Sequence, residues 1–431
     1  MLNGLEIFML ATKPEATTTF PITWVREQFP ALQAEPRTVF FDNGAGAQVP
    51  QRVLDAVHDH LLRRNVQRGG RYRQSREVDA VLTKARETVA TFLNAKEPEE
   101  IAFGMNATSF MRLISLAIGY GLGQRREIVI TDLDHEANIA TWLALEHEGA
   151  SIRWWKVRKD GALYVEDLEQ LLTPNTRLVA CTMASNAIGS VLDIRAIAQR
   201  THSVGAELFV DAVHFGPHGL IDVQALECDY LVCSGYKIFG PHMGFLWGKR
   251  AALDALPTFR EDFIPDTAPA KYEIGTYVYE NVAGMQAAIS YLEELGERVR
   301  NGTGVVGGRY ALTAAMHAIR EYEMRLSGAL LAGMAKIDDV TVYGRNKPSD
   351  AESRVPTVCF KVGNVRPQAV TETLASCGIA VRDGHMYSPR LMRRLGLSDT
   401  SGAVRASLVH YNTIEEIDSL LHELQNIVTA R

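Results

Sequence analysis

A lysine directly after a strongly apolar segment is the residue best suited to covalent chemistry in this sequence. In DYLVCSGYKIFGPHMGFLWG (229–248), an apolar run ends in Ser234, Gly235, Tyr236 and Lys237, and a Gly-Pro turn and a second apolar run follow. Partial desolvation in a cleft would lower the pKa of the Lys237 amine, which could then condense with an aldehyde. The Ser234 hydroxyl beside it could bind a phosphate oxygen. The alternative is a lysine at the end of a surface loop.

An aspartate 26 residues before Lys237 holds a similar position in the chain. In AELFVDAVHFGPHG (206–219), Asp211 lies at the carboxyl end of an apolar run, where it could simply cap the following turn. Alternatively, it could form an ion pair with a protonated pyridine nitrogen, which keeps a pyridoxal ring an effective electron sink. An acid and a lysine at the ends of neighbouring parallel strands would face one crevice, as a pyridoxal ring requires.

Short apolar or β-branched runs alternate with stretches of helical period between about residues 98 and 250. This alternation is typical of a doubly wound, mainly parallel sheet. Ligands of such sheets bind beyond the carboxyl ends of the strands, where we expect Asp211 and Lys237. The runs are EIVITD (127–132), SIRWWKV (151–157), RLVACTM (177–183), AELFVDAV (206–213), YLVCSGY (230–236) and MGFLWG (243–248).

The last third of the chain predicts a long helical region and then a smaller α/β unit. Strong helix formers with apolar residues at three- and four-residue spacing fill 282–337, interrupted by NGTGVVGG (301–308). We expect an N-terminal arm with the start of the small domain (1–35), a large cofactor-binding domain (36–290) and a small C-terminal domain (291–431). The predicted elements of the small domain are DDVTVYG (338–344), TVCFKVG (357–363), a helix around 367–377, GIAVRDG (378–384) and VRASLVHYN (404–412).

Composition excludes several classes of protein. The 431 residues carry a net charge of -6, which argues against a general attraction to nucleic acid, and the basic stretch at 63–76 is consistent with a solvated face. Five cysteines without a CxxC pair predict no disulfide framework and no zinc site, and they suggest a reducing compartment such as the cytoplasm. No run of 18 apolar residues predicts a membrane span, and the N-terminus lacks the features of a signal peptide.

Several motifs together resemble the fold-type I class V aminotransferase superfamily, and within it the group II cysteine desulfurase and selenocysteine lyase branch. The similarity runs from FFDNGAGAQVP (40–50) to the C-terminus. It implies an α/β fold with a large and a small domain, pyridoxal 5′-phosphate as the cofactor and a small amino acid as the substrate. The motifs are DHEANIATW, SNAIG, DAVHFGPHG, CSGYKIFGPHMGFLWG, KYEIGT and VRASLVHYNT.

The resemblance implies a set of contacts to the cofactor ring. Lys237 would form the Schiff base and Asp211 would pair with the pyridine nitrogen, while His135 of DHEAN would stack on the ring face. Without the resemblance, a histidine satisfied by its neighbours at a helix start is the better interpretation of His135. Asn186 would approach the ring hydroxyl and the substrate, and His214 would lie near the same hydroxyl.

The phosphate contacts implied by the resemblance depart from the family pattern. The turn in FGMNATSFMRLI (103–114) would hold the anion at a helix start, with Thr108 as the side-chain contact and Ala107 contributing only its backbone N–H. Tyr236 stands where the branch commonly has a histidine, and its phenol could replace that donor. Thr276 of KYEIGT would reach the phosphate across a subunit boundary, which would make the active enzyme a homodimer.

The substrate contacts come from the C-terminal part of the resemblance. Arg405 would clamp the substrate carboxylate with its planar guanidinium, and Arg68 would add positive charge at the mouth of the site. In RDGHMYSPRLM (382–392), Tyr387 occupies the position of the nucleophilic cysteine of cysteine desulfurases. Tyr387 and His385 would line the side-chain pocket, where Tyr387 could protonate a departing sulfur. The alternative is that Tyr387 only fills the volume of an ordered loop.

A tyrosine cannot carry a persulfide, so we do not expect sulfur transfer to a scaffold. Removal of the Cα proton by Lys237 remains possible, and the resulting carbanion has several fates. We favour C–S bond cleavage by β-elimination; epimerisation, transamination and carbon bond formation are the alternatives. A catalytically dead binding module is disfavoured, because Lys237, Asp211, His135 and Arg405 are all present.

Overall fold

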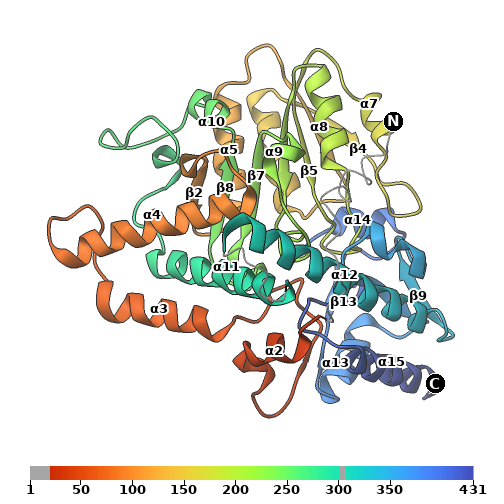
Figure 1. Ribbon diagram of the computed structural model, residues 1–431. Helices are drawn as coiled ribbons and strands as arrows, with labels where there is room; N and C mark the ends of the chain where they lie inside the picture. Colours follow the sequence, from red (N-terminus) through yellow and green to blue (C-terminus); the bar gives the residue numbers. More distant parts are fainter. Residues whose placement is uncertain (1–19, 301–306, 431) are drawn as a thin grey trace.

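The computed structural model describes residues 20–300 and 307–430, and its centre is a seven-stranded sheet (Figure 1). The strand order is β2-β8-β7-β6-β5-β3-β4, and all neighbours are parallel except β8, which is antiparallel to β2 and β7. The predicted strands are confirmed, whereas β2 was not predicted. The strands are β2 (Ile101–Gly104), β3 (Glu127–Thr131), β4 (Ser151–Trp155), β5 (Thr176–Thr182), β6 (Glu207–Asp211), β7 (Tyr230–Ser234) and β8 (Gly244–Gly248).

Helices cover both faces of this sheet. The described helices are α2 (Ile22–Glu27), α3 (Gln51–Arg64), α4 (Arg73–Leu93), α5 (Ala107–Tyr120), α6 (Ala137–Leu143), α7 (Val165–Glu169), α8 (Ile194–Ser203), α9 (Val223–Leu226), α10 (Arg250–Ala255), α11 (Tyr279–Val299), α12 (Gly308–Met334), α13 (Pro367–Ser376), α14 (Pro389–Arg394) and α15 (Ile414–Thr429). Along β5, Leu178 and Ala180 pack in a cluster with α5 and α6, while Val179 packs in a second cluster with α4, α8 and α11. Because side chains alternate between two buried faces, the central strands are continuous apolar runs, and the predicted doubly wound α/β fold is confirmed.

The predicted helical region is formed by α11 and α12. The two helices approach closely at Gly296, where an added Cβ would lie 1.9 Å from the carbonyl oxygen of Ala311. Residues 301–306 of NGTGVVGG lie outside the described residues, and so do residues 1–19, on which the N-terminal expectations fall.

A second, antiparallel sheet forms the C-terminal part of the chain, in the order β12-β13-β10-β9. α12, α13 and α15 contribute to the apolar cluster that covers it. A short N-terminal strand pairs in parallel with a C-terminal one, so residues near position 40 lie against the C-terminal part; the domain limits given above remain a prediction. The strands are β1 (Val39–Phe40), β9 (Val340–Tyr343), β10 (Thr357–Val362), β11 (Ile379–Ala380), β12 (Arg382–Gly384) and β13 (Ala403–Ser407).

Within residues 20–300 and 307–430, no helix combines the length and apolar character that crossing a bilayer demands. In the same part of the chain, no group of three or more His, Cys, Asp or Glu side chains could hold a metal ion.

Candidate active site

The acid and the lysine singled out from the sequence lie at or just beyond the ends of two neighbouring strands. β6 and β7 pair in parallel, and Asp211 is the last residue of β6. Lys237 ends a single 3₁₀ turn, Gly235–Lys237, that directly follows β7. Both side chains are buried, with exposed fractions of 5% for Asp211 and 7% for Lys237. The parallel pairing therefore brings both residues to the carboxyl edge of the sheet.

One pocket at this edge is lined by all predicted cofactor residues except Thr276. Those residues are Ala107, Thr108, His135, Asn186, Asp211, His214, Ser234, Tyr236 and Lys237. Met111, Ala137, Thr182 and Val213 line it as well and were not predicted. Thr182 could have been found because it ends β5, and Met111 because it lies one helical turn after Ala107.

Burial moves the pKa values of Asp211 and Lys237 toward each other. For Asp211, burial raises the pKa to about 6, against the opposing effects of the Val213 N–H, which donates to Oδ1 at 2.9 Å, and of the Lys237 cation. For Lys237, burial and then the Arg405 cation lower the pKa to about 8, while Asp211 and Asp42 raise it. A lysine with this pKa has a substantial neutral fraction near neutral pH, as attack on an aldehyde requires.

His135 presents a neutral ring to the pocket. Burial, followed by the Lys237 and Arg405 cations, lowers its pKa to about 4. Its Nδ1 accepts the backbone N–H of Ala137 at 3.0 Å, so the ring proton lies on Nε2. On one side the ring lies 5.5 Å from the ring of Tyr387, measured between centroids. A neutral, oriented imidazole is suited to stacking on an aromatic cofactor.

The start of α5 forms the anion-binding end of the pocket. Asn106 caps the helix by accepting the Ser109 N–H at 2.8 Å, and Ala107 and Thr108 follow with N–H groups that have no partner within the helix. Gly244 in β8 permits this placement, because an added Cβ would lie 2.4 Å from the carbonyl carbon of Asn106. The first N–H groups of a helix and its positive end favour a phosphate.

His214 carries a buried atom that lacks a partner. Its Nε2 lies 2.9 Å from the Thr357 hydroxyl, whereas Nδ1 is buried and has no hydrogen-bond partner. Burial, and then the Lys237 cation, lowers the pKa of His214 well below its usual 6.5. A buried polar atom without a partner is costly, and a ligand hydroxyl next to His214 would satisfy it. Together with the anion-binding end and Lys237, this atom fits a phosphorylated pyridine aldehyde.

Arg405 is buried and already holds two protein oxygens. Its Nη1 donates to the Asn186 carbonyl and its Nη2 to Asp42 Oδ1, each at 2.9 Å, while Nε has no partner. Asp42 also pairs with Arg382 at 2.8 Å. Asp42 was not predicted from the sequence, since 363 positions separate it from Arg405. The unpartnered Nε is a buried donor that a substrate carboxylate would satisfy.

The loop that carries His385 and Tyr387 is fixed against the pocket. The Asn186 side chain donates to the Met386 carbonyl at 2.6 Å, and the Glu136 N–H donates to the Tyr387 carbonyl at 2.8 Å. Met386 and Tyr387 both have left-handed backbones, with φ of 53° and 57°, which is uncommon for two successive non-glycine residues. The Tyr387 side chain remains 56% exposed, at the edge of the pocket beside His135.

Five predicted residues are not among those that line this pocket. Arg405 and the loop of His385 and Tyr387 contact lining residues, whereas Thr276 and Arg68 pair with other groups. Thr276 accepts a hydrogen bond from Gln67 Nε2 at 2.9 Å. Arg68 lies 3.6 Å from Asp79 and 3.8 Å from Glu273. Their roles across a subunit boundary and at the mouth of the site remain predictions.

Comparison with known proteins places this geometry in a family. Residues 39–420 match the class V aminotransferase family over most of the chain. The chain belongs to the class V aminotransferase family. Its members use pyridoxal 5′-phosphate, the cofactor that the pocket fits.

Similar proteins have different names within this class V family. An aminotransferase-like protein, FGM3, of Gibberella zeae is 37% identical over 426 residues, covering 96% of this chain and 100% of the relative. A probable cysteine desulfurase of Streptomyces coelicolor is 32% identical over 429 residues, covering 94% and 96%. The apo structure of a cysteine desulfurase from Thermococcus onnurineus superposes with a TM-score of 0.85 at 26% identity, covering 96% of this chain and 100% of that one.

Proposed function

We propose that this class V enzyme removes the Cα proton of a small amino acid and cleaves a C–S bond by β-elimination, without a persulfide on the enzyme. The observation that carries the proposal is the pairing of buried Lys237 and Asp211 in a pocket that no cysteine lines among the described residues. Tyr387, rather than a cysteine, lies at the edge of the pocket beside His135.

The cofactor is held, in this proposal, by groups at both ends of the pocket. Asp211 would pair with the pyridine nitrogen, His135 would stack on the ring and His214 Nδ1 would bond the ring hydroxyl. The N–H groups of Ala107 and Thr108 would hold the phosphate, with Ser234 and Tyr236, which line the same pocket, as further donors. When bound, the cofactor supplies an electron sink for the electrons of the broken Cα–H bond.

Lys237 would act as the base that removes the Cα proton. Its pKa of about 8 suits it to accept a proton from carbon and to return one at neutral pH. Arg405, held by Asp42 and the Asn186 carbonyl, offers Nε to the substrate carboxylate and so orients the Cα–H bond toward Lys237. Tyr387 donates its phenol proton to the departing sulfur, with His385 beside it.

The cysteines support no thiol step. Burial raises the pKa of the Cys181, Cys228, Cys233 and Cys359 thiols, which therefore stay protonated and shielded. Cys377 is exposed at the end of α13 and does not line the pocket. Elimination needs no enzyme thiol, which favours it over desulfuration through a persulfide.

Transamination is the second candidate. It is favoured by the name of the Gibberella zeae relative. It would use the same base, Lys237, but would leave the C–S bond of the substrate intact. The two reactions give different products from the same substrate.

The experiment that tests the proposal is incubation of the cofactor-loaded protein with L-cysteine, cystine and S-alkyl cysteines. β-Elimination predicts pyruvate together with sulfide or thiol, at a rate lost in Lys237→Ala and retained in a control, Lys96→Ala, at an exposed position. Alanine with sulfane sulfur would contradict the proposal by requiring a nucleophile. A keto acid that retains sulfur would favour transamination.

We also propose a homodimer in which Thr276 serves the partner's phosphate site, in a reducing compartment such as the cytoplasm. The neighbouring Ile274 is 67% exposed and Leu62 of α3 is 69% exposed, as expected of residues that a second copy covers. The test mixes Thr276→Ala with Lys237→Ala, unfolds them together and refolds them. If Thr276 acts in trans, mixed dimers recover activity; if it acts within its own chain, mixing restores nothing.

A further inference from the structure

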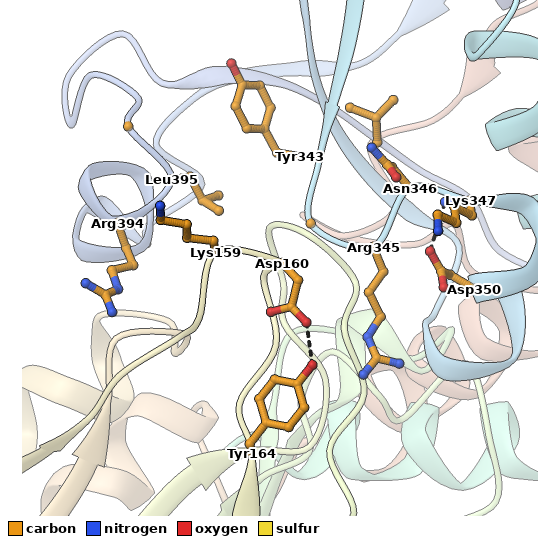
Figure 2. A pocket seen from close by; sticks show the side chains of 13 residues that line it. Lys159, Asp160, Tyr164, Tyr343, Arg345, Asn346, Lys347, Asp350, Arg394 and Leu395 are labelled. Carbon is orange, nitrogen blue, oxygen red and sulfur yellow. Dashed lines mark hydrogen bonds between the residues drawn. The ribbon is translucent and has the colours of Figure 1, made fainter. Parts of the chain in front are cut away.

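A second, larger cleft shares no lining residue with the cofactor pocket and lies where the loop before α7 meets the ends of β9 and α14 (Figure 2). It is open, has a volume of about 830 Å³, and is lined by three segments. These are the loop before α7, with Lys159, Asp160 and Tyr164; the segment 342–350, which ends β9 and follows it; and Arg394 to Gly396 at the end of α14. We propose that this cleft binds a small multivalent phosphate anion.

The positively charged side chains of the cleft are the first observation that supports anion binding. Lys159, Arg345, Lys347 and Arg394 line it, and no ion pair in the described part of the chain engages Lys159, Arg345 or Lys347. Arg394 is held in place by the Val157 carbonyl, to which its Nε donates at 2.7 Å, and lies 3.7 Å from Asp132. Figure 2 shows that different segments contribute these side chains.

The carboxylates of the cleft are already engaged by other groups. Asp160 accepts the Tyr164 hydroxyl at 2.5 Å and the Ala162 N–H at 3.2 Å. Asp350 accepts the Lys347 backbone N–H at 2.9 Å and so caps the turn that follows. Four cations and two carboxylates line the cleft, and Asp132 beside Arg394 is a third carboxylate close to it, which leaves an excess of positive charge in a chain whose net charge is -6. Such local charge, concentrated in a concave surface, attracts anions.

The backbone segments that carry two of these cations are held by close contact beside the cleft. A Cβ added to Gly161 would lie 2.6 Å from Gly344 Cα, and both glycines have positive φ, at 77° and 80°. The Ser190 hydroxyl holds the Gly161 carbonyl at 3.0 Å, and Arg354 donates to the Arg345 carbonyl. The backbone that carries Lys159 and Arg345 is thus fixed, which lowers the entropy lost when an anion binds.

The ligand chemistry follows from these donors. Guanidinium groups bind phosphate through parallel N–H donors, and ammonium groups act as point charges on the same anion. Several cations spread around an opening of this volume fit a chain of two or three phosphates better than one monovalent anion.

The test is calorimetric titration of the cofactor-loaded protein with inorganic tripolyphosphate, so that the phosphate end of the cofactor pocket is filled. Lys159→Gln/Arg345→Gln removes two cations of the cleft. Lys84→Gln/Lys96→Gln removes the same charge at exposed positions in and just after α4, far from β9 and α14 (Figure 1). Both doubles are checked for an unchanged unfolding midpoint, and Arg345→Lys keeps the charge.

We expect saturable binding of one anion per chain in the wild type and in the α4 double. The dissociation constant should rise at least tenfold in the cleft double, with Arg345→Lys in between. An equal rise in both doubles would show general charge attraction and overturn the proposal. Absence of saturable binding in the wild type would overturn it as well.

Discussion

Gly244 offers a sharp test of how the anion-binding end of the cofactor pocket is built. Its Cα faces the backbone at the start of α5, and an added Cβ would lie 2.4 Å from the Asn106 carbonyl carbon and 2.6 Å from the Ala107 nitrogen. Both groups are backbone, so neither can rotate away. In Gly244→Ala, β8 and the start of α5 must therefore separate.

The size of the effect follows from the overlap. Ordinary contacts of a Cβ begin near 3.4 Å, so the start of α5 must shift by roughly 1 Å. Overpacking of this kind typically costs about 1–3 kcal/mol of folding free energy. The shift would also move the N–H groups of Ala107 and Thr108 away from the phosphate, and a hydrogen bond to a charged group is worth about 1.5–3 kcal/mol, or roughly 10- to 100-fold in affinity. We therefore expect cofactor affinity to fall by about 10- to 100-fold.

The assay is titration with pyridoxal phosphate followed by the visible absorbance of the bound cofactor, together with urea unfolding. The matched control is Gly328→Ala in α12, where an added Cβ meets nothing within 4 Å. That change should stabilise the helix by about 0.5–1 kcal/mol and leave cofactor binding unchanged. Wild-type cofactor affinity in folded Gly244→Ala would refute the placement of the phosphate at the start of α5.

Three further predictions concern charged groups. Burial raises the pKa of Asp134 to about 8, so its carboxyl is protonated in the folded state and ionised in the unfolded state between pH 4 and 8. The protonated carboxyl therefore contributes stability below pH 4, and this contribution is lost as the pH rises toward 8. Between pH 4 and 8, the free energy of unfolding of Asp134→Asn should rise relative to that of the wild type by up to about 1.4 kcal/mol per pH unit. Urea unfolding of the cofactor-free protein measures this difference. Because the pKa of Lys237 is about 8, its neutral, reactive fraction grows as the pH rises to about 8. The rate of cofactor incorporation, followed by stopped-flow absorbance, should therefore rise up to about pH 8 and level off above it. A flat profile would contradict the assigned pKa. Arg405→Lys keeps the charge, but an ammonium cannot hold Asp42 and the Asn186 carbonyl together as the guanidinium does. The KM for the amino acid should therefore rise about 10- to 100-fold, while the absorbance of the bound cofactor stays unchanged. An unaltered KM would show that Arg405 does not bind the substrate.

Much of the fold could be predicted because the central strands are buried on both faces. Such strands become unbroken apolar runs, as in YLVCS of β7, and the helices between them keep a helical period. β2 escaped prediction because it has only four residues and lies at the sheet edge, next to the antiparallel β8. A segment this short carries too little pattern to be distinguished from a turn.

Some contacts of the candidate site could likewise be predicted from the sequence, and others could not. Asp211 and Lys237 could be predicted to meet because each follows an apolar run and parallel neighbours end at one edge. The Asp42 carboxylate, which joins Arg405 and Arg382, could not be predicted, because only tertiary packing brings these residues together. Nor does local sequence reveal that Asn186 joins Arg405 to the Tyr387 loop through its carbonyl and its side chain.

The central claim is that Lys237 holds the cofactor covalently. The most direct measurement is reduction of the cofactor-loaded protein with borohydride, followed by proteolysis and mass mapping of the lysines. We predict a pyridoxyl group on the peptide that contains Lys237, in stoichiometric yield, and none in Lys237→Ala. A pyridoxyl group on another lysine, or an unlabelled Lys237 in protein that retains visible absorbance, would contradict the account.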